Sequence, residues 1–437
     1  MRRGFKGWTR TRPLRQGRLP FMARARRRER AFKGAILALT SAVVVASIGG
    51  TRAGRFAVAS FASRARFSAR RLVLGEAGRD AAEALNQALR ARAEDLTRQA
   101  LADFYRDARP EMRRLFDATG MDPAHGLIAS GRPGEAFVLS PQVFQADDRG
   151  RSYRLRPGVR SVWLRQITLT GGPHGHFLVA DTPQVRAAAT AVGAVVEESS
   201  RQTTNSWGLR GPEPAPSAPF RVLVLGDSYM QGMFVGDDDA PPVRLERALT
   251  SLRNQRVSVL NTGHLGYCPE QYFRCLEEYG DRFRPHVLVV SVCPNDFGDG
   301  NRVLAGEGDA WDEAAHWLEE VVLWCRGRGV MSVLVPAPVE REVVAVREDG
   351  RYPGPVSDLY RGPSLSYCDP LEAFVDASLV RLVEERRRGS STMGSPLFNG
   401  HIGDGHFSPA GSELWARIVA RRVNLLMSLK KVDADRE

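Results

Sequence analysis

FRVLVLGDSY, at residues 220–229, is a short and almost continuous apolar run that ends abruptly in the small residues Gly226, Asp227 and Ser228. Such a run is typical of a β-strand that is buried on both faces. Similar runs follow at 256–260, 286–292 and 330–335. The sequence therefore predicts a set of buried strands that begins at Phe220.

Helical segments separate these strands. Two of them are 269–279, which starts with a proline and is followed by Gly280, and 312–326. Alternation of strands and helices predicts a parallel sheet with helices on both faces. Right-handed crossovers then bring all strand C-termini to one edge, where ligands bind.

Small polar residues follow three of these strands, and a fourth polar segment lies near the C-terminus. Gly226-Asp227-Ser228 follows the first strand and places a hydroxyl at the sheet edge, although Asp227 and Ser228 could equally cap the turn that follows. The other segments are NTGHLGY at 261–267, CPND at 293–296 and GDGHFSPAG at 403–411.

In their order and spacing these four segments resemble the four blocks of the SGNH, or GDSL-type, hydrolase superfamily. The resemblance covers roughly residues 205–425 and includes a lead-in from Asn205 to Gly211 that is seen in exported members. It implies a flavodoxin-like three-layer α/β sandwich and a serine hydrolase that acts on ester bonds. The chain contains no Gly-x-Ser-x-Gly elbow, which disfavours the α/β-hydrolase alternative.

Residue roles follow from the same resemblance. Ser228 is implied as the nucleophile, His406 as the general base and Asp404 as the group that orients the histidine. The implied oxyanion hole consists of the backbone N–H of Ser228, the backbone N–H of Gly266 and the side-chain amide of Asn295. Ser408-Pro409 is expected to start the last helix.

Some assignments stay open at this stage. The last block reads Asp-x-His, a spacing found in some carbohydrate-acting relatives such as alginate-type O-acetyltransferases, where Asp-x-x-His is the commoner form. This leaves the role of Asp404 open and makes His401 a rival base. Tyr267 and His264 are candidate substrate contacts, and for His264 a structural role is equally possible.

The chain gives little indication of a metal or cofactor, and we expect neither. His174 and His176 could ligate a metal, but no third ligand with matching spacing is visible. The five cysteines are odd in number and form no CxxC pair, which argues against zinc. Their apolar surroundings favour buried thiols, although export would permit a disulfide. They are Cys268, Cys275, Cys293, Cys325 and Cys368.

The net charge of +12 is confined to the N-terminus. Residues 1–33 hold thirteen Lys and Arg and one acidic residue, Glu29, so the remainder of the chain is electrically balanced. This distribution excludes the nucleic-acid-binding class that a basic chain would otherwise suggest. The 18 uncharged residues 34–51 follow directly. A spanning helix needs about 17 to 25 apolar residues, so this segment is predicted to be a signal anchor.

The positive-inside rule places the basic tail in the cytoplasm and the rest of the chain on the periplasmic or extracellular face. Cleavage after residue 49 and a start at Met22 remain alternatives. Between residues 85 and 104, apolar side chains recur every three or four residues, which predicts an amphipathic helix that Pro110 interrupts. Alternating runs at 161–164 and 176–180 predict strands.

The expected organisation has five parts. They are a basic cytoplasmic tail at 1–33, a transmembrane signal anchor at 34–51, a helical spacer at 52–120, a small β-rich region with a Pro-rich connector at 121–219, and the SGNH hydrolase domain at 220–437.

The resemblance and the predicted export together suggest a serine esterase that removes small acyl groups, such as acetyl, from an envelope or extracellular carbohydrate through an acyl-serine intermediate. A lipase-like or thioesterase-like acyl hydrolase and a polysaccharide O-acetyltransferase are alternatives. A non-catalytic scaffold or carbohydrate-binding pseudoenzyme is another. The expected partners are an acylated carbohydrate or other small ester and, through the anchor, the membrane. Nothing in the sequence indicates an oligomeric state.

Overall fold

A computed structural model describes residues 76–129, 136–147, 149, 151–168, 174–297, 308–344, 360, 364–387, 395–399 and 405–434. Contacts divide the chain into two units, Met1–Asn86 and Gln87–Glu437, and the predicted catalytic blocks lie in the second. Among the described residues, no helix has both the length and the apolar character that crossing a membrane requires. The predicted anchor at 34–51 lies outside the described residues.

A five-stranded parallel sheet forms the centre of the second unit. Its strands stand in the order β12-β11-β10-β8-β9. They are β8 (Phe220–Leu225), β9 (Val257–Asn261), β10 (Val287–Val292), β11 (Met331–Pro336) and β12 (Leu365–Tyr367). This is the flavodoxin-like order, and the four predicted strands are confirmed. The fifth strand was not predicted, because three residues are too few to show a pattern.

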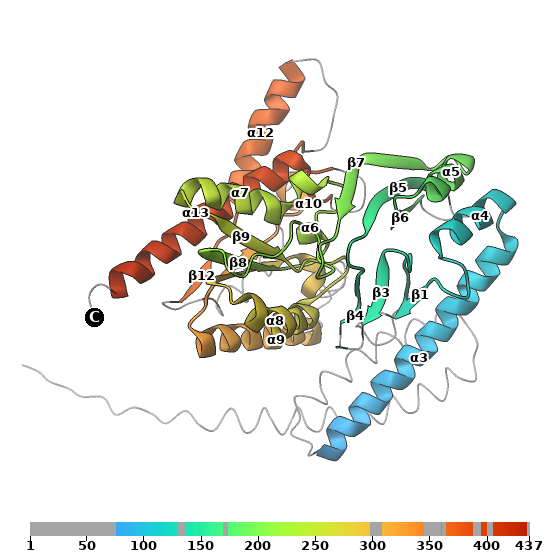
Figure 1. Ribbon diagram of the computed structural model, residues 1–437, viewed down its shortest axis with the longest axis horizontal. Coiled ribbons are helices and arrows are strands. Elements are labelled where there is room, and N and C mark those ends of the chain that lie inside the picture. The colour runs from blue at the N-terminus through green and yellow to red at the C-terminus, as the bar shows by residue number, and fades with distance from the viewer. Residues whose placement is uncertain are drawn as a thin grey trace, which may run out of the picture. The chain divides into compact units, whose positions relative to one another are not determined.

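Helices cover both faces of this sheet (Figure 1). Alternate residues of each strand enter different clusters: Leu223 and Leu225 pack with α8 (Pro269–Phe283) and α9 (Gly308–Arg328). Val222 and Val224 pack with α7 (Pro241–Arg253), α12 (Leu371–Arg387) and α13 (Pro409–Ala434). Burial on both faces explains why the strands are nearly continuous apolar runs.

Helix α8 is longer than the sequence predicts. Gly280 was expected to follow its end, but it lies inside the helix, where an added Cβ would come within 2.5 Å of the Trp324 ring of α9. The helix ends instead at Phe283, and the following residue, Arg284, caps it with a left-handed φ of 52°. Gly280 therefore serves close helix–helix packing and does not terminate the helix.

The region before the parallel sheet contains helices and small antiparallel sheets of its own. Helices α3 (Glu76–Asp107) and α4 (Pro110–Thr119) confirm the helix predicted at 85–104 and its interruption at Pro110. Strands β5 (Arg160–Thr168), β6 (His174–Ala180) and β7 (Val195–Thr203) form an antiparallel sheet with α5 (Pro183–Ala191) beside it, which confirms the two predicted strands. Leu101 of α3 and Leu115 of α4 share a core with Val162 of β5.

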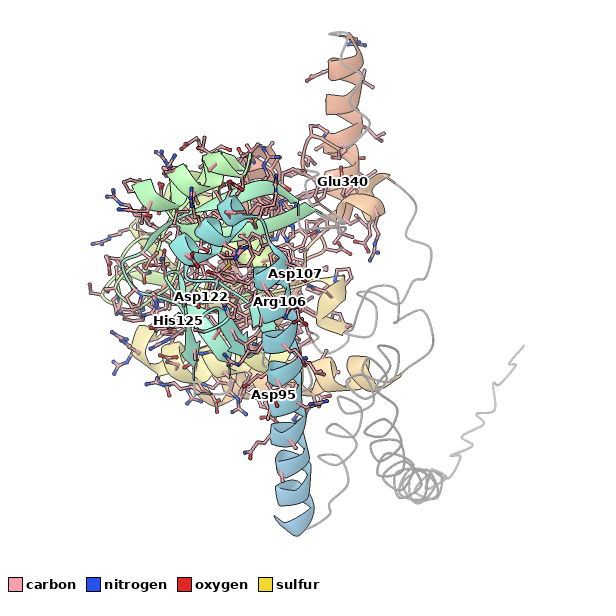
Figure 2. All side chains as sticks on the ribbon, turned by 90° about the vertical axis from the view of Figure 1, so that its right-hand side faces the viewer. Asp95, Arg106, Asp107, Asp122, His125 and Glu340 are labelled. Carbon is pink, nitrogen blue, oxygen red and sulfur yellow. The ribbon has the colours of Figure 1, made fainter. Side chains whose placement is uncertain are left out.

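The exposed side of α3 is charged. Figure 2 labels Arg106 and Asp107 near the end of the helix, where Arg106 also pairs with Asp103 at 3.0 Å. The turn after α4 holds Asp122 and His125, whose side chains are 3.1 Å apart. These pairs are exposed to solvent, so each contributes little to stability.

Two hairpins complete the N-terminal region. Strand β1 (Leu127–Ala129) pairs with β2 (Ala136–Val138), and β3 (Phe144–Asp147) pairs with β4 (Ser152–Leu155). Phe144 and Tyr153 of the second hairpin belong to the same buried cluster as α8 and α9. Residues on both sides of position 220, where the predicted hydrolase domain begins, therefore share one hydrophobic core.

Candidate active site

The predicted nucleophile lies where the order of the sheet reverses, between β8 and β10. The short helix α6 (Ser228–Gln231) begins directly after β8, and the carboxylate of Asp227 caps it by accepting from the Tyr229 N–H at 3.0 Å. Gly226 allows this tight turn, because an added Cβ would lie 2.3 Å from the Met230 side chain. The two roles considered for this segment, capping of the turn and presentation of Ser228 at the sheet edge, are therefore compatible.

The nucleophile and base predicted from the sequence meet in the structure. The Oγ of Ser228 is 2.8 Å from Nε2 of His406, although 178 residues separate them in the chain. Ser228 is only 6% exposed. At this distance an unprotonated Nε2 accepts the hydroxyl proton, which is the geometry that a general base requires.

Aromatic side chains enclose the His406 ring. Tyr229 stacks on it with centroids 4.6 Å apart, and Phe234 approaches it edge-on at 6.5 Å. The Tyr229 hydroxyl donates to the carbonyl oxygen of Gly405, which holds the histidine loop, at 2.7 Å. Desolvation lowers the pKa of His406 to about 4, so the imidazole is neutral at neutral pH and able to take a proton.

The group that orients His406 is not found among the described residues. Nδ1 of His406 is buried, and no hydrogen-bond partner for it occurs in the part of the chain that the structure describes. Asp404, the predicted orienting group, and His401, the rival base, both lie outside that part. The role of Asp404 therefore stays a prediction.

Glu340, at the start of α10 (Glu340–Val344) and labelled in Figure 2, lies next to the histidine loop. One carboxylate oxygen accepts from the Ser395 N–H at 3.0 Å. The other carboxylate oxygen lies close to Gly405: a Cβ added to this glycine, whose φ is 67°, would come within 2.6 Å of that oxygen. Ser408 and Pro409 start α13 as predicted: the Ser408 hydroxyl accepts from the Gly411 N–H at 3.3 Å.

The second block is fixed to the nucleophile turn by hydrogen bonds. The side chain of Asn261 donates to the Met230 carbonyl and accepts from the Gly263 N–H, both at 2.9 Å. The Leu265 N–H donates to the buried Gln231 side chain at 2.6 Å. An added Cβ on Gly263 would lie 2.6 Å from the Gln231 nitrogen, so the two segments are in direct contact.

Gly266 occupies the third position of a β-turn. The Tyr267 N–H donates to the His264 carbonyl at 3.2 Å, which closes the turn. Gly266 has a φ of 69°, in the left-handed region that this turn position favours for glycine. The resemblance implies that its N–H faces a substrate oxygen, and this role stays a prediction.

Asn295 lies on the short helix η2 (Pro294–Phe297) directly after β10, the neighbour of β8 in the sheet. Its side chain is hydrogen-bonded to the Asp227 carboxylate. The Cys293 thiol contacts that same carboxylate at 2.8 Å and also contacts Asn295. Burial raises the pKa of both Asp227 and Cys293, so the thiol is protonated and available as a donor. Asp227 thus links the nucleophile turn to the predicted third oxyanion donor.

Arg210 is a structural residue of the site, and its role could not be predicted from the sequence. It is buried, and its guanidinium donates to the carbonyls of Gln231, Gly232 and Val235 at 2.5 to 2.7 Å. Burial lowers its pKa to about 10, which leaves it charged at neutral pH. The only signal for it was its place in the lead-in from Asn205 to Gly211.

Both predicted substrate contacts are buried. His264 and Tyr267 are each 1% exposed and stack on one another with centroids 4.5 Å apart. Nδ1 of His264 bonds the Thr262 carbonyl at 3.0 Å, and burial lowers the pKa of this histidine to about 4. Neither side chain lies at an open surface, and a substrate contact for either stays a prediction.

Trp207, in the lead-in from Asn205 to Gly211, lies between an aromatic and a charged side chain. Trp207 stacks on Tyr279 with centroids 5.9 Å apart. The Arg282 guanidinium lies over the Trp207 ring at 3.5 Å. Trp207 therefore packs against α8, where Tyr279 and Arg282 reside.

Within the described residues, no group of three or more His, Cys, Asp or Glu side chains is placed to hold a metal. The five cysteines are free thiols, and three of them are fully buried. The expectation of buried thiols is confirmed for Cys275, Cys293 and Cys325, whereas Cys268 and Cys368 are only partly buried.

Comparison with known proteins finds matches only among solved structures. No protein-family model matches the chain, and no curated protein does. An acetyl xylan esterase matches with a TM-score of 0.38 and 16% identity, over 47% of this chain and 100% of its own. An acetylxylan esterase from Geobacillus stearothermophilus matches with a TM-score of 0.36 and 16% identity, over 47% of this chain and 94% of its own.

A putative lipolytic protein of the G-D-S-L family from Desulfitobacterium hafniense DCB-2 is a third such structure. It matches with a TM-score of 0.34 and 13% identity, over 46% of this chain and 98% of its own. All three scores and identities are low.

Proposed function

We propose that this chain is a serine esterase of the SGNH type, with Ser228 as nucleophile and His406 as general base. The observation that carries the proposal is the 2.8 Å contact between Ser228 Oγ and His406 Nε2 at the reversal point of the sheet. Ligands bind at such a point in open α/β sheets. The order of the four sequence blocks supports the same conclusion.

In the proposed reaction, Ser228 Oγ attacks the ester carbonyl carbon while its proton moves to Nε2 of His406. The carbonyl oxygen becomes an oxyanion that the N–H groups of Ser228 and Gly266 and the amide of Asn295 stabilise. When the tetrahedral intermediate collapses, the C–O bond to the alcohol breaks and His406 returns the proton to the departing oxygen. The acyl group remains on Ser228.

The second half of the reaction repeats these roles. Water attacks the acyl carbon, gives its proton to His406, and the acid leaves as the Ser228 hydroxyl forms again. A sugar hydroxyl in place of water would give a new ester, which is the acyltransferase alternative. Preformed donors act strongly here because Ser228 is almost wholly buried.

The proposed substrate is a small O-acyl ester, such as acetyl, on an envelope or extracellular carbohydrate. It rests on the Asp-x-His spacing of the last block and on the export expected from residues 34–51. Recovery of the intact chain with membranes tests the predicted signal anchor. A soluble chain that begins near Gly50 would refute the anchor.

The test uses the full-length chain with a fluorophosphonate probe and p-nitrophenyl esters of two and eight carbons. We expect labelling and hydrolysis of the acetyl ester, with kcat reduced about 10⁶-fold in Ser228→Ala. Ser251→Ala, which changes an exposed serine of α7, is the matched control and is expected to behave as the wild type.

The outcomes separate the alternatives. Labelling that persists in Ser228→Ala would refute the nucleophile assignment. A wild-type chain with neither labelling nor turnover would support the non-catalytic alternative. Preference for the eight-carbon ester would favour a lipase-like hydrolase, and acetyl transfer to an added oligosaccharide would favour the transferase.

A further inference from the structure

The phenol of Tyr153 contacts the peptide that carries a predicted oxyanion donor. Tyr153 lies on β4, 112 residues before Leu265, and its hydroxyl donates to the Leu265 carbonyl oxygen. That carbonyl and the Gly266 N–H belong to the same peptide group. In a trans peptide these two groups point in opposite directions. A donor that fixes the carbonyl on one side therefore fixes the N–H on the other.

This peptide is the central one of the turn from His264 to Tyr267, closed by the 3.2 Å hydrogen bond. Type I and type II turns differ mainly in the orientation of this central peptide. Flipping it would exchange the directions of the carbonyl and the N–H. Tyr153 also blocks the space over Gly266, because an added Cβ would lie 3.0 Å from the phenol oxygen.

The hairpin that presents Tyr153 is itself anchored to the sheet domain. The Tyr267 hydroxyl donates to the Tyr153 carbonyl, and the Gln271 side chain donates to the Arg151 carbonyl at 2.7 Å. Arg151 is 1% exposed and pairs with Asp147 of β3 and with Glu278 of α8. Such a buried, bonded network holds the phenol in one position.

We propose that Tyr153 is a positioning residue for catalysis: it holds the Leu265–Gly266 peptide so that the Gly266 N–H faces the oxyanion. The hairpin β3–β4 is then a functional part of the active site, which deepens the proposed function and rests on it. Tyr153 acts through Gly266 and needs no contact with the substrate.

The test compares Tyr153→Phe with Tyr279→Phe in the full-length chain. Tyr153→Phe removes the hydroxyl but keeps the ring, which packs edge-on against Phe144 and Tyr267 with centroids 6.0 and 5.5 Å away. Tyr279→Phe removes another buried phenol, whose oxygen bonds Arg151 of the same hairpin region but does not contact the Leu265–Gly266 peptide. A purely structural role predicts similar effects for the two variants.

We expect Tyr153→Phe to lower kcat for p-nitrophenyl acetate about 10- to 100-fold, less than the roughly 10²- to 10³-fold cost of losing a donor outright. KM should stay within about twofold, and the rate of fluorophosphonate inactivation should fall in step with kcat. Tyr279→Phe leaves the contacts of Arg151 with Asp147, Glu278 and Gln271 in place, so its kcat should stay within about twofold of the wild type. Equal losses of kcat in both variants, or none in Tyr153→Phe, would overturn the proposal.

Crystal structures of the wild type and Tyr153→Phe give a readout that is independent of activity. We expect the Leu265–Gly266 peptide to flip, or to occupy both orientations, in the variant. A peptide that keeps its single orientation would refute the positioning role, whatever the kinetics. A wild-type chain that hydrolyses no ester, with a peptide that flips in the variant, would contradict the proposed function and leave the positioning role supported.

Discussion

Ser228 Oγ and His406 Nε2 are 2.8 Å apart, but the surroundings of the two side chains differ. The nucleophile side is fixed by polar contacts: Asp227 caps the α6 turn, and Gln231 and Arg210 tie it to neighbouring loops. The backbone on the base side is also hydrogen-bonded, since Asn399 pairs with His406. The imidazole ring itself, however, is enclosed by aromatic side chains, and its Nδ1 has no partner in the described part of the chain.

This difference matches the demands of the proposed chemistry. Oxyanion donors must point at one place before the reaction starts, because their benefit comes from preorganisation. Hydrogen-bonded loops provide such fixed directions. The imidazole, in contrast, must gain and lose a proton, and an aromatic enclosure holds its ring in place while keeping its pKa low.

Removing the base is expected to have the largest effect of the three changes considered next. His406→Ala should lower kcat by about 10⁴- to 10⁶-fold, because Ser228 then lacks a proton acceptor. His401→Ala is the matched control and should retain most of the activity. Steady-state hydrolysis of p-nitrophenyl acetate measures both. Loss of activity in His401→Ala alone would show that the base side of the comparison was assigned to the wrong histidine.

Removing one donor tests the nucleophile side. Asn295→Ala should lower kcat by about 10²- to 10³-fold with little change in KM, because the amide acts on the transition state. Asn295→Asp keeps the shape but replaces the amide donor with an acceptor, so it should lose at least as much. If both variants kept the wild-type kcat, Asn295 would have only the structural contact with Asp227.

The smallest expected effect is the pH dependence of kcat/KM, which depends on the protonation of His406 alone. Because burial lowers the pKa of His406 to about 4, the imidazole stays neutral as the pH falls from 7 to 5. We therefore expect kcat/KM to be nearly constant over that range and to fall as the pH approaches 4. Stopped assays in a constant-ionic-strength buffer series measure this limb.

A carboxylate next to Nδ1 would change this profile, since it would raise the pKa of His406. Asp404→Asn is the matching variant, and it should leave the position of the limb unchanged if packing alone sets the pKa. A limb near pH 6.5 in the wild type that moves to lower pH in Asp404→Asn would instead establish Asp404 as the orienting group. The two sides of the site would then both depend on polar contacts.

The sequence was sufficient to predict much of the sheet and the contact between Ser228 and His406. Buried parallel strands need apolar residues on both faces, so residues 220–225 and 286–292 stand out as continuous runs. The small polar residues at their ends stand out for the same reason. Gly280 shows the limit of such patterns, because its role depends on the Trp324 ring from another helix.

Sequence alone therefore predicted the order of the strands along the chain, the edge at which Ser228 lies and, with His401 as a rival, His406 as its partner. Only the tertiary structure decided which residues support them. Tyr153, Arg210 and Gln231 carry no local pattern, because each acts through a hydrogen bond to a backbone group distant in sequence. Burial also depends on packing between distant segments. The place of Tyr267 and His264 in the second block therefore gave no sign that both side chains are buried.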